Sequence, residues 1–305
     1  MFFRLRRYLA NAWFNAGIRG IRQTPPISCD SGSRLVLVSQ LCHRDIDMYL
    51  LALKSLARFV APRKVVVLDD SSLTASDKDV LRRHVQPVEI RSIHSVENGP
   101  CPKGKCWERL LLISESVGSD YVVQLDSDTL TLRPPRDVLR HLADNRSFTL
   151  AGDDGECIVQ GPEMAARMQP RLKGHHDHVQ MVAEASLDRV RDSGLDRYVR
   201  GSAGFAGFAK ESFSRKRVEE LSTVMGNTIG QSKWNEWGSE QVASNLVVAN
   251  TPGAQVLPFR DYCYHRPELE MESRTFVHFM GTYRFRQGRY RRLGRQVVRE
   301  LMGRV

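Results

Sequence analysis

The sequence predicts an α/β fold with a mostly parallel sheet. Between residues 34 and 132, apolar runs typical of buried strands alternate with segments whose apolar residues recur at helical spacing. The chain has 305 residues, 41% of them hydrophobic, which is enough for one sizeable core. We therefore expect a single domain over residues 31–285, an amphipathic helix and linker at 1–30, and a basic helix or tail at 286–305.

The first segment combines apolar residues at helical spacing with neighbouring arginines. Two interpretations stay open, because such a helix can lie in a membrane interface or pack on the protein's own surface. Two consecutive prolines, Pro25 and Pro26, break the helix. Its predicted apolar face consists of Phe2, Leu5, Leu9, Trp13 and Ala16.

The next elements follow in alternation. Apolar runs predict strands at residues 35–40, 64–68, 88–93 and 121–125, and helical spacing predicts helices at 46–59, 76–83 and 107–117. Ser76 is the expected cap of the second of these helices. After Leu132 the pattern becomes irregular, with glycines, prolines and short apolar runs.

The strand at 121–125 runs directly into Asp126-Ser127-Asp128. In parallel sheets, ligands gather at the carboxyl ends of the strands. If the extended backbone continues, its two-residue period points both carboxylates the same way, so that they can share one hard cation. An isolated D-x-D triplet is most often a solvated turn, but its position after an apolar strand favours a metal site.

In the order of its motifs, the sequence resembles the GT-A glycosyltransferases, and more loosely their family-eight-like retaining branch, over about residues 34–285. The resemblance implies a single GT-A, Rossmann-like domain, with acceptor recognition in the half after Leu132. The matching segments are Leu35–Gln40, Leu68-Asp69-Asp70, Lys105-Cys-Trp-Glu-Arg-Leu, Leu125-Asp126-Ser127-Asp128, Gly201-Ser-Ala-Gly-Phe205, Trp237-Gly-Ser-Glu240-Gln241 and Val277-His278-Phe279-Met280-Gly281.

The resemblance implies a divalent metal site made of Asp126, Asp128 and His278. A histidine in an H-F-x-G segment completes the site in such enzymes, although an isolated histidine between two apolar residues is more often part of the core. An imidazole beside two carboxylates suits Mn²⁺ at least as well as Mg²⁺. The cation would bridge the phosphates of a nucleotide-diphosphate sugar and neutralise the leaving diphosphate.

The resemblance also implies where the donor binds. Ser39, Gln40 and either Asp69 or Asp70 would recognise the base and ribose. The two acids could equally cap the helix near Ser76, and both roles can hold together.

Two cations precede the D-x-D strand. Lys105 or Arg109 would approach the sugar or the diphosphate. For Arg109 a position on the helix surface stays an equal alternative.

Glu240-Gln241 resembles the Asp-Gln pair that lies near the reacting sugar in the retaining branch, with Glu in place of Asp. That branch tends to have another Asp where this chain has Val242, so the mechanistic subclass stays open. Glu240 could act as the general base of an inverting displacement, or Gln241 could face the sugar in a retaining one. The competing interpretation is an exposed glutamate at the start of a helix after Gly238.

The glycines between Gly201 and Gly207 would allow a bound sugar or another strand to approach the backbone closely. The segment from Gly99 to Cys106 fits a P-loop except at its last position, where the hydroxyl is missing. Its two prolines also remove backbone donors.

The net charge of +10 indicates an anionic partner. The resemblance implies a nucleotide-sugar donor, most simply a UDP-sugar, and a glycan or glycolipid acceptor. A non-catalytic sugar-nucleotide or glycan-binding protein of the same fold, and a basic nucleic-acid-binding protein, are the alternatives, but no nucleic-acid-binding motif accompanies the charge. Six cysteines without a C-x-x-C pair indicate reduced thiols in a cytoplasmic protein, and the arginine-rich end predicts peripheral binding at the inner face of an anionic membrane.

Overall fold

The computed structural model describes residues 2–174, 176–190 and 194–303, without the side chains of residues 2–7. The chain forms two compact units. One comprises Met1–Ser92, Leu125–Leu139 and Arg260–Val305, and the other comprises Ile93–Gln124 and Arg140–Phe259. Helices and mostly parallel strands alternate along the chain, which confirms the predicted α/β class. The domain boundaries expected at residues 30 and 285 stay predictions.

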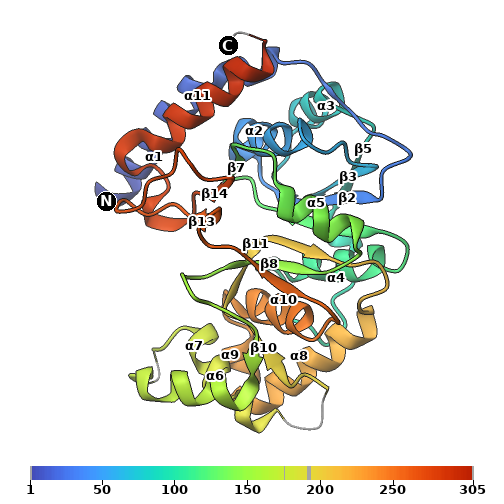
Figure 1. The fold of residues 1–305 in the computed structure, drawn as a ribbon, viewed down its shortest axis with the longest axis vertical. Helices are drawn as coiled ribbons and strands as arrows, with labels where there is room; N and C mark the ends of the chain where they lie inside the picture. Colours follow the sequence, from blue (N-terminus) through green and yellow to red (C-terminus); the bar gives the residue numbers. More distant parts are fainter. Residues whose placement is uncertain (1, 175, 191–193, 304–305) are drawn as a thin grey trace. The chain divides into compact units, whose positions relative to one another are not determined.

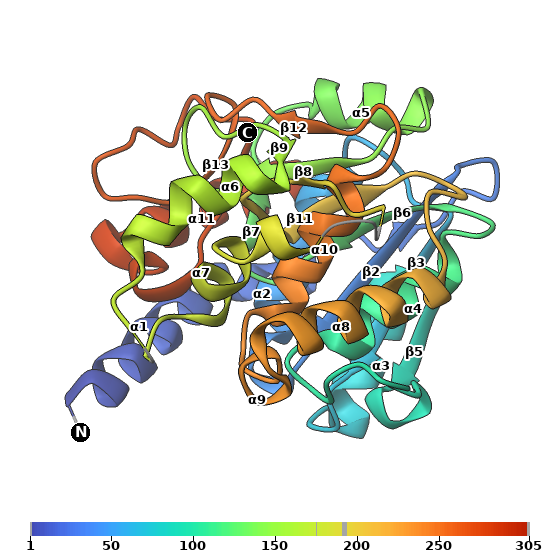
Figure 2. The same cartoon turned by 90° about the horizontal axis from the view of Figure 1, so that it is seen from below.

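Three strands of the first unit pair with one another in parallel. β2 (Leu35–Leu41) pairs with β3 (Lys64–Asp69), and β3 pairs with β5 (Val88–Ser92), with Gln40 opposite Leu68. Figure 2 shows the three strands side by side. β2 and β3 are buried along almost their whole length, as their valine and leucine runs predict. Their carboxyl ends present the polar residues that follow.

Helix α2 (Ile46–Ala57) is buried on nearly all sides. α1 (Phe2–Ile18) and α11 (Arg289–Leu301) lie side by side and pack against it (Figure 1). The apolar residues of α11, among them Leu293 and Val297, are buried. The predicted basic tail is therefore, over its described part, a helix docked on the first unit.

The buried face of α1 differs from the predicted one. Phe14 and Ile18 are fully buried, whereas Leu9 and Trp13 are 56% and 51% exposed. The predicted positions Phe2 and Leu5 lie outside the described side chains. The helix therefore packs on its own protein through one face and leaves an apolar stripe on the surface.

Helix α3 (Ala75–His84) begins one residue earlier than predicted. Its cap is Thr74 and not Ser76, because the Thr74 hydroxyl accepts from the Asp77 amide at 3.2 Å while the Asp77 carboxylate accepts from the Thr74 amide at 2.8 Å. This reciprocal capping box satisfies two amides that Ser76, already inside the helix, could not reach.

In the second unit, β8 (Phe148–Ala151) pairs in parallel with β12 (Gln255–Leu257) and antiparallel with β11 (Gly201–Phe208). A Cβ on Gly207 would lie 2.2 Å from the Phe148 ring, and one on Gly201 would lie 2.4 Å from the Thr149 hydroxyl. The glycines of β11 therefore allow the side chains of the neighbouring strand to approach, which is the second of the two roles considered for them.

The region after Leu132 is more regular than predicted, because helix α8 (Arg215–Ile229) and helix α10 (Ser239–Ala249) lie within it. Further helices are α4 (Trp107–Ser116), α5 (Arg136–Ala143), α6 (Gly161–Met168), α7 (Val179–Glu184) and α9 (Gln231–Trp234). Further strands are β1 (Ile27–Ser28), β4 (Val85–Gln86), β6 (Tyr121–Leu125), β7 (Thr129–Thr131), β9 (Val159–Gln160), β10 (Arg197–Tyr198), β13 (Tyr262–Tyr264) and β14 (Phe276–His278).

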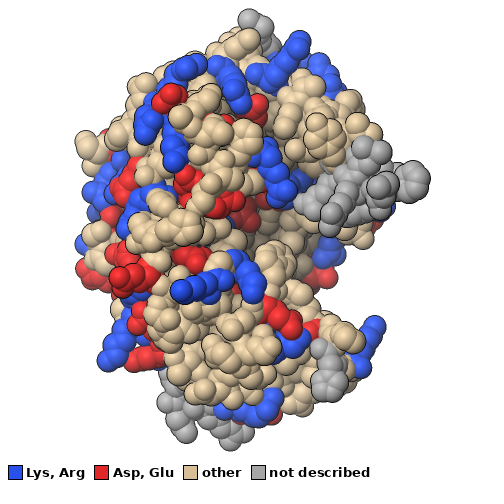
Figure 3. Space-filling view, turned by 180° about the vertical axis from the view of Figure 1, so that it is seen from behind, with Lys and Arg blue, Asp and Glu red and all other residues tan. Residues whose placement is uncertain are grey.

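The surface has mixed charge. On the face drawn in Figure 3, lysines and arginines are interspersed with acidic side chains. No helix within the described ranges is both long and apolar enough to cross a membrane.

Candidate metal centre

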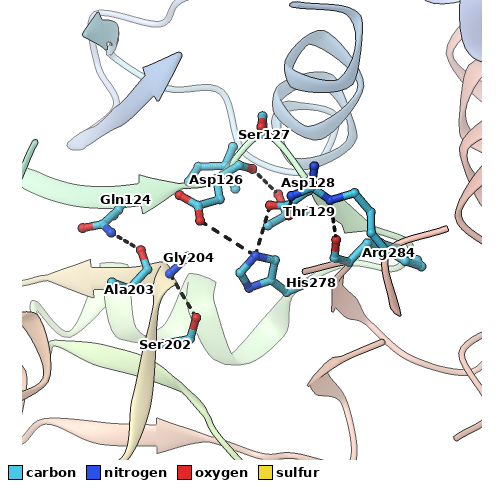
Figure 4. A network of polar contacts seen from close by, with 12 residues as sticks. Gln124, Asp126, Ser127, Asp128, Thr129, Ser202, Ala203, Gly204, His278 and Arg284 are labelled. Atoms are coloured by element: carbon cyan, nitrogen blue, oxygen red, sulfur yellow. Dashed lines mark hydrogen bonds and ion pairs between the residues drawn. The ribbon is translucent and has the colours of Figure 1, made fainter. Parts of the chain in front are cut away.

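Two carboxylates lie in the turn between β6 and β7. β6 ends at Leu125 and β7 begins at Thr129, so the Asp126–Asp128 segment is a turn and not the continued strand considered above. The Thr129 hydroxyl donates to the Asp126 carbonyl at 2.9 Å and closes this turn. Both side chains nevertheless point to the same place (Figure 4).

His278 reaches this turn from a distant part of the sequence. β14 pairs antiparallel with β7, which places His278 opposite Thr129. The Phe279 amide donates to the Asp128 carbonyl at 2.7 Å. The sheet register therefore brings the imidazole beside the two carboxylates, although Asp128 is 150 residues away along the chain.

The three side chains converge closely. His278 Nε2 lies 3.1 Å from Asp128 Oδ1 and 3.8 Å from Asp126 Oδ2, and one ligand atom from each residue lies within 4.8 Å of the other two. The Asp126 side chain is 31% exposed, but those of Asp128 and His278 are only 6% and 4% exposed. The group therefore has one open side, at Asp126.

Burial and charge oppose each other at this site. Burial alone would raise the pKa of the Asp128 carboxyl, but His278 and Arg284 outweigh it and lower the pKa to about 2. Burial would lower the pKa of His278, but Asp128 and Asp126 outweigh it and raise the pKa above its usual value. Asp128 is therefore an anion across the physiological pH range.

Arg284 also contacts this group, although nothing in the sequence distinguishes it from the arginines that follow. Its Nη2 pairs with Asp128 Oδ2, and its Nε donates to the Phe279 carbonyl at 3.0 Å. The two oxygens of Asp128 therefore have different neighbours, with His278 at Oδ1 and Arg284 at Oδ2.

Aromatic packing supports the ligands from behind. The Phe279 ring stacks on Tyr290 of α11 with centroids 4.1 Å apart, and Tyr290 packs on Phe14 of α1 at 4.2 Å. Because Phe279 follows His278 directly, this stack restricts how far the imidazole can move.

The donor set suits a divalent cation. Carboxylate oxygens and an imidazole nitrogen are ligands of Mn²⁺ and Mg²⁺, and imidazole favours the softer Mn²⁺. The other imidazole nitrogen, Nδ1 of His278, is buried and finds no partner among the described residues. The ring therefore directs Nε2, the nitrogen facing both carboxylates, toward the position that a cation would take.

The expected donor-binding residues at the ends of β2 and β3 differ in accessibility. Ser39 is fully buried and donates to the Leu125 carbonyl at 2.7 Å. Asp69 is buried and pairs with Lys78 at 2.8 Å, while Asp70 is partly exposed and accepts from the Ser72 hydroxyl at 2.6 Å. Gln40 is also partly exposed, and its Oε1 is buried without a hydrogen-bond partner among the described residues. Neither acid caps α3.

The expected residues of the second unit form two contacts of their own. Arg109 is buried, which excludes the surface position considered for it, and its Nη2 lies 3.5 Å from Glu240 Oε1. Helix α10 begins after Gly238 as expected, but Glu240 is buried and not exposed. Gln241 Nε2 donates to Gln180 Oε1 at 3.1 Å. The Lys105 ammonium donates to a backbone carbonyl, that of Asn235.

Comparison with known proteins gives matches in structure alone. No protein-family model and no curated protein matches the sequence. The bifunctional glycosyltransferase WbbM matches over 90% of this chain at 13% identity with a TM-score of 0.47, and this chain spans about half of it, 52%. The galactosyltransferase LgtC, in complex with donor and acceptor sugar analogues, matches over 88% of this chain and 100% of its own length. The identity is 11% and the TM-score is 0.47. The apo form of the glycosyltransferase GlyE of Streptococcus pneumoniae TIGR4 matches over 88% of this chain and 60% of its own length. The identity is 12% and the TM-score is 0.49. All three of these solved structures are glycosyltransferases.

Proposed function

We propose that the protein is a metal-dependent glycosyltransferase that moves a sugar from a nucleotide-diphosphate sugar, with a UDP-sugar as the first candidate, to a glycan or glycolipid acceptor. The convergence of Asp126, Asp128 and His278 at the end of a buried strand supports this function. The site offers carboxylate oxygens and an imidazole nitrogen, both of which are ligands of Mn²⁺, and this favours catalysis over a non-catalytic nucleotide-sugar-binding role.

The residues of the first unit would hold the cation and the donor. Asp126 and Asp128 would each offer a carboxylate oxygen and His278 its Nε2, while Gln40 and Asp70 are accessible enough to contact the nucleoside. A divalent cation in this position neutralises the charge that develops on the leaving diphosphate. The open side at Asp126 leaves room for the phosphate oxygens.

In the second unit, Glu240 and Gln241 are the proposed residues at the reacting sugar, and Lys105 and Arg109 are the proposed contacts to the sugar or diphosphate. Glu240 would act as the general base in an inverting displacement, and its Oε1 lies 3.5 Å from Arg109 Nη2. The amide of Gln241 would instead face the sugar in a retaining reaction. Proton NMR of the freshly formed product distinguishes the two, because it reports the anomeric configuration directly.

A coupled assay tests the activity. Purified protein is incubated with Mn²⁺ and a panel of nucleotide sugars, and release of free nucleotide is scored with and without excess chelator. We expect release only with metal, and its loss in the Asp126→Ala variant, because Asp126 is a ligand on the exposed side of the site. The control Asp79→Asn removes an exposed carboxylate of α3 and should leave release unchanged. Full activity in excess chelator would refute the proposal.

We further propose that the surface of α1 and α11 binds the inner face of an anionic membrane. Arg292, Arg295 and Arg299 of α11 are exposed, and so are Leu9 and Trp13 of α1. Arg291 bridges the two helices, since its Nε donates to the Trp13 carbonyl at 3.0 Å. Basic residues gain about 1 kcal/mol each near anionic lipid, and exposed aromatic residues can insert between headgroups.

Vesicle binding tests this surface. We expect binding to vesicles that contain phosphatidylserine, none to pure phosphatidylcholine, and release at high salt. Because α11 is part of the core, charge substitution is a cleaner test than truncation. Arg295→Gln with Arg299→Gln should weaken binding by about tenfold or more, whereas the matched pair Arg82→Gln with Arg83→Gln on α3 should not. Equal binding to both vesicle types would contradict the proposal.

A further inference from the structure

Arg284 places a permanent positive charge against one of the proposed metal ligands. Its guanidinium pairs with Asp128 Oδ2 and is fixed by the bond from its Nε to the Phe279 carbonyl. The side chain is only 17% exposed. Figure 4 shows Arg284 and His278 on opposite oxygens of the same carboxylate. The guanidinium is therefore a built part of the site and not a surface charge that happens to lie nearby.

This arrangement limits what Asp128 can offer to a cation. With Oδ2 paired to Arg284, only Oδ1 faces His278 and Asp126. Asp128 can then act as a single-oxygen ligand, and a bidentate contact would require breaking a buried ion pair. Such pairs are costly to break, because the remaining charge loses its partner in a desolvated position.

Arg284 lowers the attraction of this group for a free cation. Its guanidinium offsets the charge of the Asp128 carboxylate, and the imidazole of a metal ligand is neutral. A free divalent cation would therefore bring a further positive charge close to the guanidinium in a mostly buried site. A cation that arrives together with a diphosphate would bring less positive charge, because the phosphates supply negative charge.

Resting on the proposed function, we infer that Arg284 makes the site select the complex of a divalent cation with a nucleoside diphosphate over the free cation. Arg284 is thus a specificity-determining residue for the form in which the metal binds. The guanidinium and the cation would lie against the same carboxylate and repel each other. Even at an effective dielectric constant of about 20, this Coulomb repulsion lowers the affinity of the site for the free cation by about tenfold or more.

The test measures metal binding without turnover. Mn²⁺ affinity of the metal-free protein is followed by the EPR signal of free Mn²⁺, and UDP affinity at saturating Mn²⁺ by calorimetry. Arg284→Gln should bind Mn²⁺ alone about tenfold or more tightly than wild type, yet bind UDP with Mn²⁺ no more tightly. Arg286→Gln, which removes an exposed charge two residues away, should match wild type in both measurements.

Two further variants separate charge from shape. Arg284→Lys keeps the charge and should retain the weak Mn²⁺ binding, and Arg284→Met gives a second neutral side chain of similar length should the glutamine variant not fold. If the neutral variants bind Mn²⁺ as weakly as wild type or more weakly, the proposed role of Arg284 is overturned. If Asp126→Asn still abolishes Mn²⁺ binding in that case, the metal site itself is retained. Absence of Mn²⁺ binding in wild type and all variants, with or without UDP, would overturn the metal site as well.

Discussion

Asp128 is buried and ion-paired, and this predicts a stability effect that can be measured without any substrate. In the folded protein the pKa of its carboxyl is about 2, compared with 3.8 for the ordinary group. One pH unit of difference between folded and unfolded states corresponds to about 1.4 kcal/mol. Because the side chain is only 6% exposed, little solvent screening applies. Ionised Asp128 therefore contributes about 2–3 kcal/mol to the free energy of unfolding.

The Asp128→Asn variant should lose this contribution. We expect a free energy of unfolding about 2–3 kcal/mol below wild type in urea titrations at neutral pH with chelator present. The folded-state pKa is depressed, so the contribution is fully present above about pH 4 and is lost as the pH falls toward 2. The difference between wild type and variant should shrink accordingly in acid.

The neighbouring carboxylate provides the control. Asp126 is 31% exposed, and Asp126→Asn should cost less than about 1 kcal/mol while abolishing activity as fully as Asp128→Asn. The two proposed ligands of one cation should therefore differ in what their replacement costs the fold, because Asp128 is buried and Asp126 is partly exposed. Equal unfolding free energies of wild type and Asp128→Asn at neutral pH would refute the reasoning.

Further variants test the metal ligand, the docked helix and the glycine-rich strand. His278→Ala should raise the Mn²⁺ concentration for half-maximal nucleotide release by about tenfold or more, and unchanged metal dependence would remove His278 from the ligand set. Phe14→Ala should lower the free energy of unfolding by about 3–5 kcal/mol, since Phe14 is fully buried. Trp13→Ala on the exposed side of the helix should lower it by less than about 1 kcal/mol. Gly207→Ala should cost about 1–3 kcal/mol or more because of the Phe148 ring, and a variant as stable as the control Gly118→Ala would contradict the packing argument.

Much of the fold was predictable because local patterns determined it. The valine and leucine runs of β2, β3 and β6 indicated strands whose ends agree with the structure to within a residue. The cap of α3 was misplaced because Thr74 and Ser76 are chemically equivalent candidates. Each is followed by an aspartate three residues later, Asp77 and Asp79, so the sequence pattern does not separate them, and in the structure Asp77 closes the capping box with Thr74.

The buried face of α1 was predicted incorrectly for a different reason. Apolar residues occur on more than one side of this helix, and the choice of Phe14 and Ile18 depends on packing against α11, which lies at the other end of the chain. The side of a helix that a distant element covers is not encoded in the helix itself.

The site shows the same division between local and distant information. The strand ending in two carboxylates pointed to Asp126 and Asp128, and the resemblance supplied His278. Arg284 remained one arginine among several, since its meeting with Asp128 depends on the turn after β14. The burial of Glu240 and its pairing with Arg109 likewise depend on the packing of α4 against α10, where the Trp107 indole donates to Ser239 at 2.9 Å.

The packing of α11 links the proposed membrane surface to the proposed metal site. Tyr290 lies at the start of this helix and stacks on Phe279, the residue after His278, while the exposed arginines lie further along the same helix. Deleting the chain after Phe285 would therefore remove the lipid-facing charges and uncover a ring that supports a metal ligand. Loss of vesicle binding and loss of activity would then coincide for two unrelated reasons. Substituting Arg295 and Arg299 changes only the exposed face, so a variant that releases from vesicles yet keeps full activity on a soluble acceptor would separate the two roles of the helix.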